Sequence, residues 1–245
     1  VLSSGSYRKQ KAPGTLAQDV DIVSGKVKRD FDINPYSFAL NSSRTLDPDK
    51  FYTRNYAPFN IKHELNENYI DINVADLKFQ TELKWKPIKS VETSLLGAIK
   101  YQSTSQEHHV TEFSNQAKAY RAMPNTTVRD NNPYLYTNPD NPYALPISVL
   151  PAGGIYSKTD HTMYGYDMRA TASYKNEFNN IHTVNFYLGA EMNAADRKRN
   201  NFTGWGMQYS LGENPFYIYE LFKKGVEENN LYYGLYNSKY RNLAC

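Results

Sequence analysis

Two pairs of segments alternate between apolar and polar residues with a period of two. In the first segment, residues 77–86, one face carries Leu77, Phe79, Thr81, Leu83 and Trp85, and the other carries Lys78, Gln80, Glu82 and Lys84. Residues 91–101 repeat the pattern with Leu95 and Ile99 on the apolar side. A period of two is that of a β-strand. We therefore predict a hairpin of strands at about 69–86 and 91–103, whose turn pairs Trp85 with Val91 and Lys84 with Glu92.

The second pair of segments follows the same plan. Tyr164, Tyr166 and Met168 alternate with polar residues over 164–175, and Val184, Phe186 and Leu188 do so over 181–193. Only a few residues separate the two segments, so they form a second hairpin. The fold class is therefore all-β.

The apolar phase reverses near the start of the first strand. Ile70, Ile72 and Val74 occupy the opposite parity from Leu77 and Phe79. A β-bulge at Ala75–Asp76 would insert one unpaired residue and explain the reversal. A break in the strand is the alternative.

Short and long connections alternate along the chain. The predicted strands leave long segments at 1–68, 104–163 and 194–230, and residues 231–243 resemble one more strand. Structureless loops of this length are uncommon in compact soluble domains, whereas outer-membrane barrels alternate short periplasmic turns with long extracellular loops. We predict part of an antiparallel transmembrane β-barrel with extracellular loops at 1–68, 104–163 and 194–230. A secreted β-sandwich also alternates in this way and remains open on periodicity alone.

The long loops contain two stretches with helical spacing. Val110, Phe113, Ala117 and Tyr120 recur every three or four residues, and apolar residues recur less regularly over 216–222. Short helices within the loops are expected there.

Composition agrees with strands and polar turns but names no partner. The chain has 22 Tyr and 11 Phe among 245 residues, and aromatic residues favour strands. A formal charge of +3 gives no basic field of the kind that binds nucleic acid, and the run Arg197–Arg199 is interpreted as solvated loop. Cys245 is the only cysteine, which leaves no disulfide framework and no cysteine metal site.

Motifs for catalysis or cofactor binding are missing from the sequence. Gly204–Gly206 lacks the third glycine of a phosphate loop, and His63-Glu64 has no second histidine four residues on. His108 and His109 are adjacent, so on an extended chain they point to opposite sides. Oxygen ligands at Asp130, Asn132, Asn138 and Asp140 suit calcium, but turn formation is the favoured interpretation. We predict a non-enzyme without cofactor or metal.

Motifs across nearly the whole chain resemble the SusC/RagA family of TonB-dependent transporters. They lie at residues 34–37, 41–47, 51–60, 97–101, 119–124, 132–136, 141–146 and 204–209. The resemblance implies that residues 1–245 are the central part of one barrel domain in the bacterial outer membrane, without its plug domain. It also implies import of a bulky oligosaccharide or peptide, energy from TonB through the N-terminal region, and a SusD-like surface lipoprotein over the barrel.

Aromatic residues in the long loops are the candidate binding residues. Exposed aromatic side chains that enter a partner's pocket dominate binding energies. The candidates for contact with the lipoprotein or the nutrient are Tyr134, Tyr136, Tyr143, Trp205 and Tyr209. The alternative, that such rings pack a loop against itself, is favoured for these Asn-Pro-aromatic units.

Overall fold

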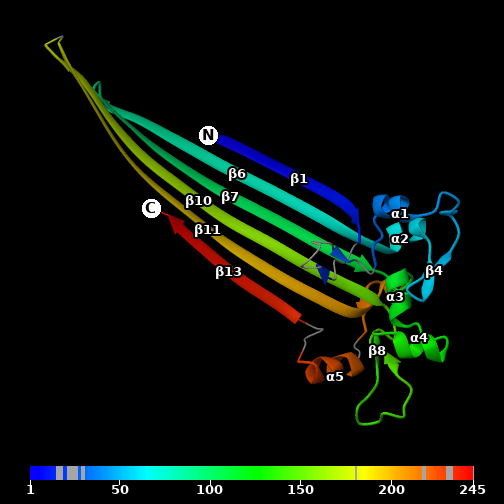
Figure 1. Ribbon diagram of the computed structural model, residues 1–245. Coiled ribbons are helices and arrows are strands. Elements are labelled where there is room, and N and C mark those ends of the chain that lie inside the picture. Colours follow the sequence, from blue (N-terminus) through cyan, green and yellow to red (C-terminus); the bar gives the residue numbers. More distant parts are fainter. Residues whose placement is uncertain are drawn as a thin grey trace.

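The computed structural model describes residues 1–14, 19–20, 27–28, 31–179, 181–216, 219–229 and 234–244. Its main feature is one antiparallel sheet of seven strands that curls like half a barrel (Figure 1). The strand order is β1 (Leu2–Pro13), β6 (Asn68–Ile88), β7 (Val91–Val110), β10 (Gly154–Phe178), β11 (His182–Gln208) and β12 (Asn214–Pro215), with β13 (Gly234–Ala244) also paired to β11. The prediction of an antiparallel all-β fold is confirmed.

The strands are longer than the hydrophobic alternation indicates. The segments predicted at 91–103, 164–175 and 181–193 extend to 91–110, 154–178 and 182–208. Much of the predicted loops 104–163 and 194–230 is therefore strand, and the prediction was wrong there. Ser103 and Asn200 lie on the side of the sheet that is apolar nearer the hairpin turns, and there both faces are polar. The hydrophobic periodicity therefore disappears, although the backbone ladder continues.

The first 14 residues also differ from the prediction of a long loop over 1–68. Leu2–Pro13 forms β1, which pairs with β6 along its whole length, from Leu2 opposite Gln80 to Pro13 opposite Tyr69. Serines, lysines and Gly5 give this strand no apolar alternation. Its pairing is set by the free edge of β6 rather than by a buried face.

The predicted bulge at Ala75–Asp76 is absent, because β6 and β7 pair without a shift from Asn68 to Trp85. The apolar phase reverses because the character of each face changes along one regular strand. The turn also differs from the prediction: Ile88 pairs with Val91, and Trp85 pairs with Thr93. This slip of two residues leaves each side chain on its predicted face.

Short helices and two-stranded sheets cluster at one end of the long strands (Figure 1). The helices are α1 (Pro35–Asn41), α2 (Ile61–Glu67), α3 (Asn115–Tyr120), α4 (Thr126–Asn131), η1 (Tyr209–Leu211) and α5 (Tyr219–Glu227). One pair, β2 (Asp19–Val20) with β3 (Val27–Lys28), lies apart from this cluster in Figure 1. The small sheets of the cluster are β4 (Tyr52–Arg54) with β5 (Ala57–Phe59), and β8 (Leu135–Tyr136) with β9 (Ile147–Ser148). We call this region the loop lobe.

Asparagine and serine begin the helices of the loop lobe. The side chains of Asn34, Asn60, Ser114 and Asn125 accept hydrogen bonds from backbone N–H groups in the first turns of α1 to α4. Such caps satisfy the otherwise unpaired donors of a helix start. The predicted helix at 110–120 is confirmed for Ala117 and Tyr120, whereas Val110 ends β7.

The hydrophobic core lies in the loop lobe. Its main cluster includes Phe31, Val110, Tyr120, Leu150 and Ile155, all at most 9% exposed. Of the long strands, only the ends of β7, β10 and β11 contribute to it, and β11 does so through the partly buried Trp205. Among the residues that the structure describes, no helix is both long and apolar enough to cross a membrane.

Candidate functional site

In the half of the sheet nearer the hairpin turns, the cross-strand register gathers the large apolar side chains on one face. Leu77 lies opposite Tyr101, which lies opposite Tyr164, and Leu83 lies opposite Leu95. We call this the apolar face. Thirteen of its large side chains are 41 to 65% exposed: Leu77, Phe79, Leu83, Trp85, Leu95, Ile99, Tyr164, Tyr166, Met168, Val184, Phe186, Leu188 and Met192.

The apolar face has a definite height. It consists of rows of side chains that are cross-strand neighbours. The row nearest the loop lobe contains Leu77, Tyr101 and Tyr164, and the row nearest the hairpin turns contains Val91, Tyr174 and Phe186. Ten residue steps along β7 span about 33 Å, and a strand tilt of about 40° reduces this to a height of about 25 Å. This is the height of the apolar band of an outer-membrane barrel.

The opposite face of the same rows, here called the polar face, carries paired charges and hydroxyls. Lys100 Nζ lies 2.6 Å from Asp167 Oδ2, and Arg169 Nη2 lies 2.9 Å from Glu191 Oε2. The hydroxyls of Ser94 and Thr171 are 2.6 Å apart. Lys86 pairs with Glu92 at 3.0 Å. One sheet therefore separates an apolar surface from a hydrophilic one.

Between the Leu77 row and the loop lobe, the side of the sheet that bears the apolar face becomes polar. Here the register aligns Asp71 with Glu107 and Glu107 with Lys158, whose ammonium lies 3.5 Å from Glu107 Oε1. The apolar face thus ends while the strands continue toward the loop lobe.

Aromatic rings surround His109 on this same side of the sheet, at the end of the strands next to the loop lobe. The His109 ring lies 4.8 Å from Tyr69, 5.2 Å from Tyr156 and 5.8 Å from Tyr209, measured between ring centroids. Lys11 Nζ lies 3.7 Å from the centroid of Tyr69. The rings come from β6, β7, β10 and η1, so the cluster joins strands to the loop lobe. Sequence spacing missed it because only the register aligns these residues.

Four of the five candidate aromatic residues pack inside the protein. The rings of Tyr134 and Trp205 lie 4.1 and 5.5 Å from the ring of Tyr120 in the main core. Tyr136 is buried and its hydroxyl donates to Glu227 Oε2 at 2.5 Å. Tyr209 donates to the Ile155 carbonyl at 3.0 Å.

Tyr143 differs from the other four candidates, because it is 98% exposed. It lies in the connection between β8 and β9. Of the five, it is the residue whose ring is open to a partner.

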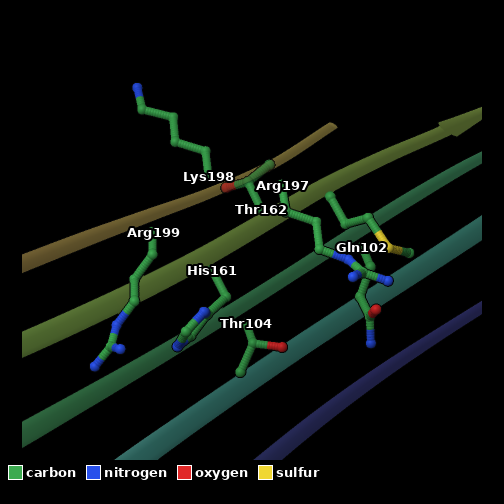
Figure 2. Close-up of a pocket in the computed structure, with 8 residues that line it drawn as sticks. Gln102, Thr104, His161, Thr162, Arg197, Lys198 and Arg199 are labelled. Carbon is green, nitrogen blue, oxygen red and sulfur yellow. The ribbon is translucent and has the colours of Figure 1, made fainter. Parts of the chain in front are cut away.

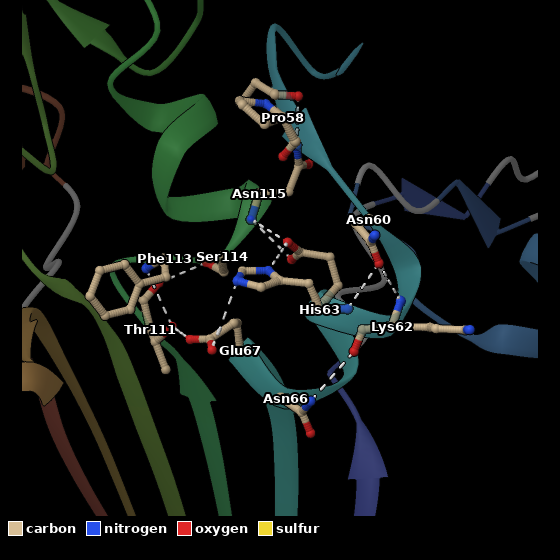
Figure 3. Close-up of polar contacts among 12 residues, drawn as sticks. Pro58, Asn60, Lys62, His63, Asn66, Glu67, Thr111, Phe113, Ser114 and Asn115 are labelled. Carbon is tan, nitrogen blue, oxygen red and sulfur yellow. Dashed lines mark hydrogen bonds and ion pairs between the residues drawn. The ribbon is translucent and has the colours of Figure 1, made fainter. Parts of the chain in front are cut away.

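A polar network ties α2 to α3 in the loop lobe (Figure 3). The buried Glu64 carboxylate accepts the Asn115 N–H at 2.9 Å through each oxygen, and the Asn115 amide donates to the carbonyls of Arg54, Ala57 and Pro58. Thr111 donates to Glu67. Burial raises the pKa of Glu64, although the hydrogen bonds from Asn115 oppose that change. The network fixes the lobe rather than forming a reactive site.

The residues considered for metal binding have other contacts. His108 Nε2 lies 2.7 Å from Asn68 Oδ1, on the opposite face from His109. Asn132 bonds to the carbonyls of Ala119 and Ala122, and Asp140 pairs with Lys223 at 2.6 Å. Within the described ranges, no group of three or more His, Cys, Asp or Glu side chains is placed to hold a metal ion.

The chain was compared with protein-family models and with curated proteins. No protein-family model matches the chain, and no curated protein matches it.

Proposed function

We propose that this chain is part of a transmembrane β-barrel in the bacterial outer membrane, with the apolar face toward lipid and the polar face toward the lumen. The observation that carries the proposal is the exposure of the apolar face, thirteen of whose large side chains keep 41 to 65% of their surface open. Lipid would cover these side chains, and paired charges such as Lys100 and Asp167 would meet water in the lumen.

In water, the apolar face would be costly to leave uncovered. Burying one large apolar side chain stabilises a protein by about 1.5–3 kcal/mol, and soluble monomers rarely expose apolar patches above a few hundred Å². The apolar face carries thirteen such exposed side chains over a height of about 25 Å, so it is larger than an ordinary apolar patch on a soluble monomer. A hydrocarbon layer removes that cost without a second protein layer.

A soluble β-sandwich fits these observations less well. A sandwich covers the apolar face of one sheet with the apolar face of another at about 10 Å. In the described part of the chain, the sheets other than the main one have two strands each. The hydrophobic core also lies in the loop lobe rather than against the apolar face.

Within this proposal, the barrel belongs to a TonB-dependent transporter of the SusC/RagA type, and the motifs of the loop lobe support that assignment. The loop lobe then lies outside the cell, where Tyr143 is the candidate contact for a SusD-like lipoprotein or for the nutrient. The cargo is a bulky oligosaccharide or peptide. Energy from TonB would enter through the N-terminal part of such a transporter.

Cell fractionation tests the membrane assignment. The complete protein that carries this chain should sediment with outer membranes and resist extraction by alkaline carbonate, because lipid covers the apolar face. Recovery in the soluble or secreted fraction would favour the β-sandwich module instead.

A further inference from the structure

Three side chains that carry or can carry positive charge lie on the polar face. Arg197 and Arg199 project from β11, and His161 projects from β10, where it pairs with Arg199 (Figure 2). With Gln102, Thr104, Thr162, Met163 and Lys198, they line a cavity of about 400 Å³, although the Lys198 side chain points to the opposite side of β11 (Figure 2). We call Arg197, Arg199 and His161 the basic patch. The sequence run Arg197–Arg199 was interpreted as loop, and the structure corrects this, because the run lies inside β11.

Alternation along β11 separates the three basic residues of the run. The side chain of Lys198 points away from those of Arg199 and His161 (Figure 2). Arg197 and Arg199 share a face because they are two residues apart on a strand. Two guanidinium groups therefore lie on one wall of the cavity.

Among the described strands, the register places no acidic residue opposite Arg197 or Arg199. The cross-strand neighbours of Arg199 are His161 and Ser238, and those of Arg197 are Met163 and Tyr240. Nearer the hairpin turns, by contrast, Lys100 and Arg169 of the polar face each have a carboxylate within 3 Å. The polar face thus pairs its cations elsewhere and gathers them without a neighbouring acid at this cavity.

We propose that the basic patch binds an acidic group of the nutrient, and that the nutrient is an acidic oligosaccharide. Each guanidinium presents a planar fork that matches the two oxygens of a carboxylate. The Gln102 amide and the Thr104 hydroxyl supply neutral partners for sugar hydroxyls, and Met163 supplies an apolar contact for a ring face. A volume of about 400 Å³ is in the range of small-ligand pockets. This inference rests on the proposed function, since it assigns the polar face to the lumen.

Binding by the complete purified protein in detergent tests the inference, with trigalacturonate as the acidic probe and maltotriose as the neutral one. Arg197→Gln and Arg199→Gln should each weaken trigalacturonate binding by about tenfold, because each removes a charge-assisted hydrogen-bonding group. Lys198→Gln is the matched control, since it removes the same charge one residue away and should change binding by less than about twofold. Heat-modified gel mobility shows whether each variant is folded.

Three results would overturn the inference. One is equal weakening by Lys198→Gln and Arg199→Gln, which would reduce the effect to net charge. Another is failure of the folded wild-type protein to bind trigalacturonate more tightly than maltotriose. A third is equal or tighter binding of triglutamate, which would replace the acidic sugar with an acidic peptide. These measurements need no membrane, so their failure is separate from failure of the fractionation test.

Discussion

Lysine in place of Leu95 separates a lipid-facing surface from a water-facing one. Leu95 lies four residue steps above Val91 and six below Tyr101, near the middle of the apolar face, and it is 47% exposed. If that face meets water, a lysine there keeps its charge solvated and changes the free energy of unfolding by about 0.5 kcal/mol or less. If it meets hydrocarbon, the cost is about 2–4 kcal/mol.

Ser94→Lys is the matched control, because the neighbouring residue lies on the polar face. The substitution loses the contact between the Ser94 and Thr171 hydroxyls, which are 2.6 Å apart. That loss costs about 0.5–1.5 kcal/mol, while the new ammonium stays in lumen water. We therefore expect Leu95→Lys to be the more destabilising of the two.

Urea unfolding of the complete protein in phospholipid vesicles measures both variants, with tryptophan fluorescence as the signal. A Leu95→Lys variant as stable as Ser94→Lys, or more stable, would refute the assignment of the apolar face to lipid. A loss of stability in vesicles that disappears in a water-soluble form of the protein would support it, since a buried soluble face would be sensitive in both.

Three further predictions concern the polar face and the loop lobe. A double-mutant cycle on Lys100 and Asp167 should give a coupling of about 0.2–1 kcal/mol in urea unfolding, since both are partly exposed, and a coupling near 3 kcal/mol would indicate a dry lumen. Burial raises the pKa of Glu64, so its contribution to stability is present below the unfolded-state pKa and is lost as pH rises through the folded value. The free energy of urea unfolding should therefore fall over that range in wild type and by less in Glu64→Gln, and an equal fall in both would contradict this. Tyr136→Ala should destabilise by about 3–5 kcal/mol, while Tyr143→Ala should leave stability unchanged and reduce capture of the surface lipoprotein; a destabilised Tyr143→Ala would place that ring in the core.

The face of each side chain could be predicted from sequence wherever one face carries apolar residues and the other carries polar ones. Alternation at Leu77, Leu83 and Leu95 identified strands and faces, and the structure keeps these residues on one face although the pairing is shifted by two residues from the predicted one. A period of two fixes parity but not register, because a slip of two residues preserves every face.

Strand ends could not be predicted, because hydrophobic periodicity stops where both faces are polar. Residues 103–106 and 197–201 have little apolar character, yet their backbone groups continue the ladder between β7, β10 and β11. Similarly, β1 is held by β6 and not by a buried stripe. In such segments the neighbouring strand determines the structure.

Which of the candidate aromatic residues stay exposed could not be predicted from the sequence. Tyr134, Tyr136, Trp205 and Tyr209 pack inside the protein, because large rings gain more from burial than from exposure. The basic patch and the rings around His109 depend on register across β7, β10 and β11. Residue spacing within one segment carries no information about such alignments.

Spin labels placed singly at positions 93 to 99 of β7 test the central claim most directly. In a Cys245→Ser background, the complete protein in lipid vesicles is probed with oxygen, which concentrates in hydrocarbon, and with a water-soluble nickel chelate. The proposal predicts high oxygen and low nickel accessibility at 93, 95, 97 and 99, alternating with the reverse at 94, 96 and 98. High nickel accessibility at both Leu95 and Ile99 would contradict it, because the apolar face would then meet water.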